Sequence, residues 1–292
     1  MIDTRHVAVL ACALVAAGIA GNAQAQTQDV AAARSELGFS YLLGLGDQSV
    51  SYSERSSLLP VRSKATTHSP LIVSGALYAI NRDLLFSLDS QLTFAPGSAT
   101  ESWTATSGTF NGQTLTSRVI QTNGFSLSQN TTDLLGHYRV TRDWFAVGGV
   151  ALHTQTFKRY GFVQGVDKAA ALPADRTVEE STSEALADIG VALEPGRVRD
   201  EPMHYGLRAM LAVPMWRRTD NTQSPGVHFK SSSGLDLSLE GRCSWRIHDG
   251  IHAGVWGQWL ESRRDRSVVG QLELPDSRTR TLSVGLELLW KL

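Results

Sequence analysis

His153 comes nearest to a nucleophilic catalytic pattern in this sequence. It stands in the run His153-Thr154-Gln155, where a histidine could act as a general base if a nucleophile and an orienting acid were within reach. Serine would be the expected nucleophile, and threonine occupies that place. We therefore interpret His153 as a histidine hydrogen-bonded to its neighbours, and we assign no catalytic residue.

The other residues with metal-ligand chemistry are scattered. The chain has 8 histidines and 2 cysteines, but no two histidines are paired at an i, i+2 or i, i+4 spacing on one face, as a metal site would require. Besides His153, the histidines of the mature chain include His68, His137, His204, His228 and His252. We therefore expect neither a metal site nor a cofactor.

The N-terminus has the layout of an export signal. Arg5 and His6 precede an apolar run from Val7 to Ala20, and Ala23-Gln24-Ala25 supplies the small residues for cleavage. This pattern predicts a signal peptide over residues 1–25 and a mature domain over 26–292. Cleavage as a lipoprotein at Cys12 is the alternative, and it would leave almost no apolar segment before the cysteine.

Charge and hydropathy exclude two classes of partner and fold. The 27 basic and 28 acidic residues nearly cancel, so no electrostatic footprint for nucleic acid is present. After the signal, no apolar run approaches the roughly 18 residues of a membrane helix. If the mature chain enters a membrane, it must do so as a closed barrel, because lipid satisfies no backbone polar group.

Apolar and polar residues alternate with a period of two in several segments, which indicates strands with one apolar and one polar face. The clearest segments are 234–246, 282–292 and 36–46. In the first, Leu235, Leu237, Leu239 and Trp245 alternate with Asp236, Ser238, Glu240 and Arg242; in the second, Leu282, Val284, Leu286 and Trp290 alternate with Ser283, Gly285 and Glu287, with Leu289 as an exception. Noisier alternation predicts strands at 70–80, 84–94, 125–140, 144–158, 183–194, 203–216 and 251–262.

The connections between these ten segments alternate in length. Residues 81–83, 141–143 and 248–250 form tight turns, and 195–202 is a somewhat longer one. Long polar connections are expected at 53–69, 95–124, 159–182, 217–232 and 263–277. This layout predicts an all-β fold: a closed antiparallel transmembrane β-barrel of about ten strands, with short periplasmic turns and long extracellular loops.

The residues that lead into the turns share a short sequence motif that fits this architecture. Tyr78-Ala79-Ile80-Asn81-Arg82-Asp83 matches Tyr138-Arg139-Val140-Thr141-Arg142-Asp143, with a shorter version beginning at Trp245. Aromatic residues just before a turn are typical of the interfacial girdle.

With these features the chain resembles the small outer-membrane β-barrel proteins of Gram-negative bacteria. Its end is also similar to their C-terminal assembly signal, carried by Ser283, Gly285, Leu288 and Trp290, although Lys291 and Leu292 displace the usual final aromatic. The resemblance implies a location in the cell outer membrane. It also implies contact with outer-membrane lipid and lipopolysaccharide, and assembly by periplasmic chaperones and the barrel-assembly machinery.

The polar faces predict a filled interior, because a barrel of this size encloses little space. By parity the inward acids are Glu36, Asp89, Asp188, Asp236, Glu240 and Glu287, and the inward bases are Arg139, Arg208, Arg242, Arg246 and Lys291. Such a balanced set favours a lumen closed by ion pairs, since an unpaired buried charge costs far more than a paired one. A narrow polar passage is the alternative.

We therefore expect a non-enzymatic surface or envelope protein with a largely closed lumen and an unknown extracellular ligand. The alternatives are a narrow channel for small solutes and a barrel hydrolase that acts on lipid A or peptides. An omptin-like site would need carboxylate pairs and a His–Asp pair near the outer rim, and no Asp-x-Asp occurs on the predicted strands. The run Arg263-Arg264-Asp265-Arg266 either contacts lipopolysaccharide phosphates or is a solvated loop rim.

Overall fold

The computed structural model describes residues 38–56, 60–110, 113–114, 116–165, 174–194 and 202–291. The predicted signal peptide, Glu36 and most of the connection 195–202 lie outside these residues. The long strands are β1 (Phe39–Arg55), β2 (Val61–Ala79), β3 (Leu84–Thr93), β4 (Ser98–Ala105), β7 (Val119–Arg139), β8 (Trp144–Gln164), β9 (Val178–Leu193), β10 (Met203–Asn221), β12 (Gly234–His248), β13 (Ile251–Arg264) and β16 (Asp276–Lys291). No helix in the described part is long and apolar enough to cross a membrane.

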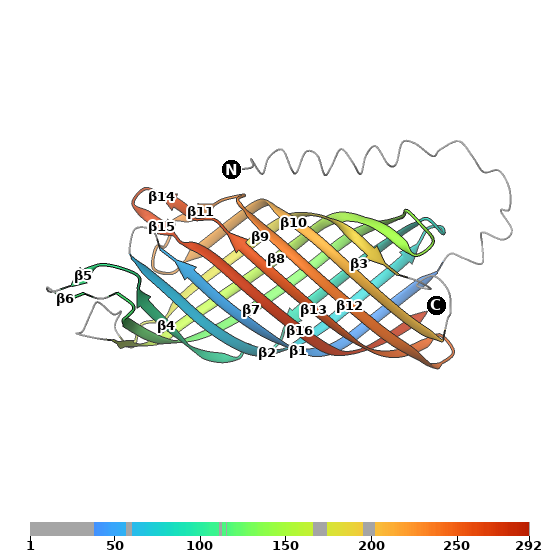
Figure 1. Cartoon of the computed structure of the whole chain (residues 1–292), viewed down its shortest axis with the longest axis horizontal. Coiled ribbons are helices and arrows are strands. Elements are labelled where there is room, and N and C mark those ends of the chain that lie inside the picture. Colours follow the sequence, from blue (N-terminus) through green and yellow to red (C-terminus); the bar gives the residue numbers. More distant parts are fainter. Residues whose placement is uncertain are drawn as a thin grey trace.

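These strands form an antiparallel ring, because β1 pairs with both β16 and β2 (Figure 1). The main sheet has 12 strands; β11 (His228–Lys230) pairs with β10 off the main path, and β3 and β4 occupy one position in succession between β2 and β7, which leaves ten positions. The predicted antiparallel barrel of about ten strands is confirmed.

The strand register gives the barrel its tilt. A row of paired residues that starts at Phe39 passes around all ten positions and returns to β1 at Ser51, a stagger of 51 − 39 = 12 residues. With about 3.3 Å per residue and about 4.8 Å between strands, this stagger corresponds to a tilt of about 40°. The value is typical of outer-membrane barrels.

Short turns and long connections lie at opposite ends, as predicted. The turns at 81–83, 141–143 and 248–250 join β2 to β3, β7 to β8 and β12 to β13 at the end where the C-terminus lies. The small hairpins lie at the other end (Figure 1): β5 (Thr109–Phe110) with β6 (Gln113–Thr114), and β14 (Ser267–Val269) with β15 (Leu272–Leu274). Following the architecture, the short-turn end is periplasmic.

An apolar belt surrounds the outside of the barrel at its periplasmic half. Its exposed members include Leu43, Leu45, Leu88, Leu134, Leu152, Val191, Leu207, Leu239, Val255 and Leu286. The predicted outward residues Leu235, Leu237, Leu239, Trp245, Leu282, Val284 and Leu286 are all exposed, and Trp290 is half-buried. Tyr78 and Trp245 are exposed beside the periplasmic turns, where an interfacial girdle belongs. Exposed apolar side chains in this number require lipid around them.

Beyond the belt the strands continue as an extracellular collar: residues 48–55, 61–69, 98–105, 119–130, 155–164, 178–184, 217–221, 262–264 and 276–280. Here the polarity inverts. Outward positions carry mostly serine, threonine, lysine and arginine, whereas Val50, Tyr52, Phe125, Leu127 and Phe157 form a buried apolar cluster inside. The collar is therefore built like a water-soluble barrel.

The collar corrects the predicted connections. Residues 53–69, 95–124, 159–182, 217–232 and 263–277 were expected to be loops, but large parts of them are strand; between β1 and β2 only residues 56–60 remain. The reason is that the outward side chains there are hydrophilic, so the alternation between apolar and polar residues weakens although the strand continues. Pro96 and Gly97 mark the break between β3 and β4.

Apolar residues also pack inside the belt. Trp256 of β13 is 4% exposed and lies against Gly44 and Gly46 of β1 and Gly285 of β16. A Cβ at Gly285 would come within 2.7 Å of Trp256 Nε1 and 2.5 Å of Leu45 O, so glycine makes room for the indole ring. Leu289, the exception in the alternation, packs inward on the same cluster.

Candidate functional site

Three buried arginines at successive levels organise the polar lumen: Arg208 in the belt, Arg264 above it, and Arg159 in the collar. Each lies on a different strand and binds two carboxylates from other strands. Charge-assisted hydrogen bonds between arginine and carboxylate are strong, and those of Arg264 with Glu184 and of Arg159 with Glu101 are also bidentate, which makes them geometrically specific.

Arg208 crosses the lumen. Its Nη1 donates to Asp89 Oδ2 of β3 at 2.9 Å, and its Nη2 donates to Glu240 Oε2 of β12 at 2.7 Å. Four strand pairings separate β10 from β3 around the ring. Arg242 extends the network, with 2.5 Å from Nε to Glu240 Oε1 and 3.3 Å from Nη1 to Glu287 Oε2. The lumen is thus bridged at this level by linked ion pairs.

Arg264 forms the second level. Its Nε and Nη2 donate to Glu184 Oε1 and Oε2, each at 2.6 Å, and its Nη1 and Nη2 donate to Asp236. His153 Nδ1 lies 3.3 Å from Glu184 Oε2, and Arg217 Nε lies 3.5 Å from Glu184 Oε1. Glu184 therefore contacts three basic side chains, those of Arg264, His153 and Arg217. His153 is hydrogen-bonded to a neighbour, as predicted.

Arg159 forms the third level, in the collar. Its guanidinium donates to Glu101 Oε2 at 2.8 Å and to Glu54 Oε2 at 2.9 Å, and it stacks near the rings of Tyr52, Phe125 and Phe157. Burial raises the pKa of the Tyr52 phenol, which therefore stays protonated and donates to Glu54 at 2.5 Å.

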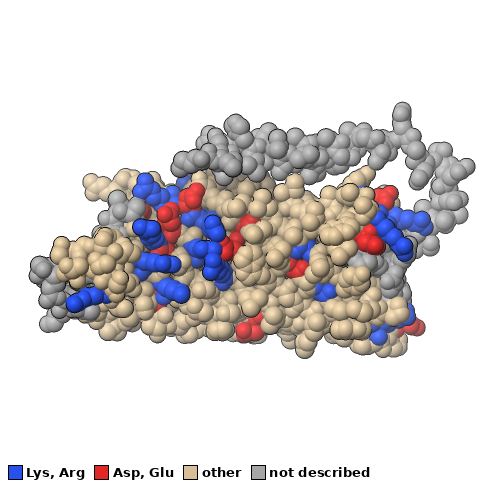
Figure 2. Space-filling model, in the orientation of Figure 1, with Lys and Arg blue, Asp and Glu red and all other residues tan. Residues whose placement is uncertain are grey.

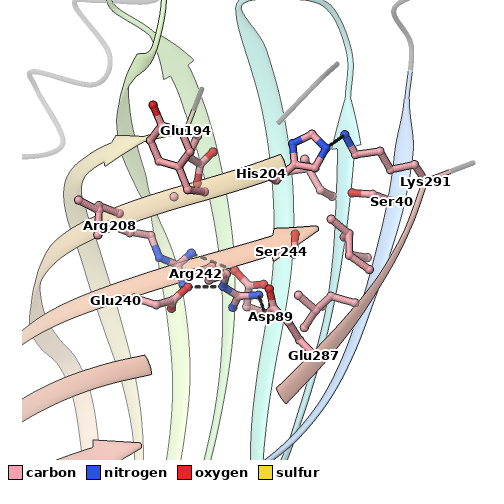
Figure 3. A pocket seen from close by; sticks show the side chains of 18 residues that line it. Ser40, Asp89, Glu194, His204, Arg208, Glu240, Arg242, Ser244, Glu287 and Lys291 are labelled. Atoms are coloured by element: carbon pink, nitrogen blue, oxygen red, sulfur yellow. Dashed lines mark hydrogen bonds and ion pairs between the residues drawn. The ribbon is translucent and has the colours of Figure 1, made fainter. Parts of the chain in front are cut away.

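Two small cavities lie between these levels. A cavity of about 80 Å³ near the periplasmic end is lined by Glu194, His204, Lys291 and the Arg208–Glu240–Arg242 group (Figure 3). A second, of about 70 Å³, is lined by Asp133, Asp188 and His153. Arg208 lines both and separates them. Pockets for drug-sized ligands have about 300–1,000 Å³, so these spaces fit a few waters.

At the periplasmic mouth, Lys291 Nζ lies 2.8 Å from His204 Nε2, and the rings of His204 and His252 are 4.5 Å apart. Both histidines are buried. Of the predicted inward bases, Arg246 is exposed beside the turn, and Arg139 is half-buried with its Nε 3.7 Å from Asp83.

The predicted inward acids are placed correctly within the described residues, since Asp89, Asp236, Glu240 and Glu287 are all buried and Asp188 lines the second cavity. The sequence reasoning missed Arg159, Arg264, Glu54, Glu101 and Glu184. The sequence pattern placed Arg264 in the last long loop, either in contact with lipopolysaccharide phosphates or at a solvated rim, whereas strand alternation directs Arg263 outward and Arg264 into the lumen. If the inward–outward alternation predicted for 251–262 is continued for two more residues, it places Arg264 inside the lumen.

The structure also brings together a serine–histidine pair that the sequence pattern did not indicate. Ser87 Oγ lies 2.9 Å from His137 Nε2, and His137 Nδ1 lies 3.8 Å from Glu194 Oε2. A nucleophilic serine must be accessible to its substrate. Ser87 is 1% and His137 0% exposed, and neither lines one of the two cavities. We interpret the pair as a structural hydrogen bond.

A His–Asp pair does lie at the rim, but on the outside. Asp220 of β10 pairs with His228 of β11, and Arg218 Nε donates to Asp220 at 3.0 Å. His228 and Arg218 hold the pKa of Asp220 below its usual range. The neighbouring Thr219 is buried, so Asp220 faces away from the lumen. No group of metal-ligating side chains occurs among the described residues.

Comparisons with known proteins identify the architecture. No protein-family model and no curated protein matches the sequence. Among solved structures, the outer membrane protease OmpT from Escherichia coli aligns with a TM-score of 0.61 at 8% identity, covering 87% of this chain and 97% of OmpT. OprG from Pseudomonas aeruginosa aligns with a TM-score of 0.33 at 8% identity, covering 88% and 97%.

Fold and belt together define a class: the chain is an outer-membrane β-barrel protein. The ring of strands satisfies the backbone within lipid, and the apolar belt supplies the lipid-facing surface. Identity of 8% to OmpT shows the fold alone, and one fold supports many activities.

Proposed function

We propose that this protein is a non-enzymatic, non-conducting outer-membrane protein that acts through its outer surface and extracellular collar. The observation that carries this proposal is the crossing of the lumen by hydrogen-bonded side chains at several levels. Besides the three arginines, Gln91 of β3 donates to Gln258 of β13 at 2.9 Å, again across four strand pairings.

A permeating ion would have to break these contacts. Arg208, Arg264 and Arg159 are buried together with their carboxylate partners, and removing one partner of a buried pair leaves a charge without compensation. Arg208 lines both cavities, so its ion pairs lie between them. The interior thus favours a structural core over a passage.

The outside of the collar is the surface left for interaction. It is polar and belongs to the rigid strand framework, which is how outer-membrane barrels present binding residues to the medium. We also propose that the chain reaches the membrane through periplasmic chaperones and the barrel-assembly machinery. This rests on the terminal pattern Ser283, Gly285, Leu288 and Trp290, which lies on the closing strand β16.

A conductance measurement tests whether the protein is a channel. Purified, folded protein is inserted into planar lipid bilayers, with a general porin in the same bilayers as the positive control. We expect no single-channel steps above baseline. Regular steps from the unaltered protein, at a frequency that follows its concentration, would overturn the non-conducting part of the proposal.

A turnover assay tests whether the protein is a hydrolase. The folded protein is incubated with a peptide library and with lipid A, and products are followed by mass spectrometry. We expect no cleavage. Turnover that disappears in His153→Ala or His228→Ala, while heat-modifiable gel mobility shows normal folding, would identify an active site and refute the non-enzymatic assignment.

A further inference from the structure

Basic side chains gather on one outer face of the barrel, directly beyond the apolar belt. Figure 2 shows them over the extracellular part of the face formed by β13, β16, β1 and β2. We call this group the basic patch. It consists of Arg55, Arg62, Lys64, Arg263, Arg278 and Arg280.

The strand register brings these residues together. Arg263 pairs with Arg278, which pairs with Ser53, which pairs with Lys64, so that one row spans four strands. With about 4.8 Å between strands, three cations lie along roughly 14 Å. Arg280 lies two residues from Arg278 on the same face, and only the short serines of β1 separate the two halves of the row.

Glu261 holds three of the arginines in place. It accepts hydrogen bonds from Arg263 Nε at 2.7 Å, from Arg278 Nη2 at 2.6 Å and from Arg280 Nε at 2.9 Å. One carboxylate thus serves three guanidinium groups, so positive charge remains in excess. The side chains of Arg263 and Arg280 are 61% and 53% exposed, which leaves donors open to a ligand.

A further observation points to an acceptor from outside the chain. Within the part of the chain that the structure describes, Arg62 and Lys64 have no ion-pair partner. Donors of this kind favour binding of a multiply charged anion.

The position of the patch indicates what that anion belongs to. Immediately toward the periplasm, the next outward row is apolar on β13 and β16, where Trp259 pairs with Leu282, and on the adjoining strand β12, where Leu239 pairs with Trp259; on β1 and β2 the same row carries Ser49 and His68. A ligand that covers both rows must carry negative charge at the headgroup level and hydrocarbon below it. Anionic phosphate matches guanidinium, and acyl chains match the belt.

We propose that the basic patch binds the phosphate groups of lipopolysaccharide in the outer leaflet, with the acyl chains lying against Leu282 and its neighbours. Glu261 acts as a positioning residue that orients the arginines. This goes beyond the proposed function, because it assigns a lipid and a site to the outer surface and does not depend on a closed lumen.

Binding of purified lipid A to the folded chain in detergent micelles tests the proposal. Bisphosphorylated and dephosphorylated lipid A are titrated against the unaltered protein, against Arg278→Ala/Arg280→Ala, and against Arg62→Ala/Lys64→Ala. Lys158→Ala, an exposed lysine on the distant strand β8, is the matched control. We expect each double variant to weaken binding of the bisphosphorylated form by about tenfold or more, and the control to bind as the unaltered protein does.

Three results would overturn it: equal affinity for both forms of lipid A, unchanged affinity in a folded Arg62→Ala/Lys64→Ala variant, or complete competition by inorganic phosphate at matched ionic strength. The last would show a site for free phosphate. Because Arg62 and Lys64 make no ion pair within the described part of the chain, that variant remains informative even if the Arg278→Ala/Arg280→Ala protein fails to fold.

Discussion

Arg208 and Asp89 meet across the interior of the barrel, 2.9 Å from Nη1 to Oδ2, although they belong to strands on opposite sides of the ring. The contact ties β10 to β3 without any backbone pairing between them. It therefore acts as a cross-brace of the barrel wall, and it also divides the lumen into two cavities.

Arg208→Met should destabilise the barrel strongly. The substitution keeps most of the volume but leaves Asp89 and Glu240 buried without their cation, which costs about 3–5 kcal/mol. Urea unfolding in lipid vesicles, followed by tryptophan fluorescence, measures the free energy of unfolding. Arg208→Met/Asp89→Asn should lose less than the sum of the single variants, since the two residues are coupled. Additive losses would contradict a direct pair.

Glu240→Gln should lower the free energy of unfolding more than Arg242→Gln. Glu240 accepts from both Arg208 and Arg242, whereas Arg242 is more exposed, with 18% of its side chain accessible against 7% for Glu240. Each variant leaves a buried partner without its counter-charge, at a cost of a few kcal/mol. The same urea assay gives the order, and a greater loss in Arg242→Gln would show that Glu240 is not the centre of the network.

Insertion should depend on depth in the belt. Leu286→Arg places a charge among Leu45 and Val255 and should cost about 2–4 kcal/mol. Leu237→Arg should cost less, because the cross-strand partner of Leu237 is Glu261. Heat-modifiable gel mobility and urea unfolding compare the two. Equal losses would mean that Glu261 cannot compensate an arginine at the upper edge of the belt.

Gly285→Ala should destabilise the seam between β13, β16 and β1. The added Cβ would overlap Trp256 and the backbone at Leu45, and overpacking typically costs about 1–3 kcal/mol. Gly257→Ala is the matched control, since the nearest atom to its Cβ lies 3.7 Å away. Thermal unfolding should rank Gly285→Ala below both the control and the unaltered protein; an unchanged midpoint would refute the packing argument.

Sequence patterns were sufficient for the belt and its turns. A strand that crosses lipid must place apolar side chains on one face, so the alternation of Leu235, Leu237 and Leu239 with Asp236 and Glu240 determines both the strand and its facing. The short turns follow from the same patterns, because they interrupt the alternation abruptly.

The collar and the site required the tertiary structure. In the collar, serines and threonines face outward, and a mixture of side chains such as Tyr52, Phe125 and Arg159 faces inward. Apolar and polar residues therefore do not alternate regularly, and a strand cannot be told from a polar loop by its sequence. Whether Arg159 and Arg264 are solvated or buried depends on partners from distant strands.

The sequence by itself therefore determined the architecture, the membrane-facing surface and the inward parity of residues such as Arg208 and Glu240, because lipid imposes a local rule on every strand. Only the tertiary structure decided which charges pair across the lumen, and that Arg278 and Lys64 share one row on the outside. Those relationships depend on the twelve-residue stagger between strands, which is a property of the closed ring and of no single segment.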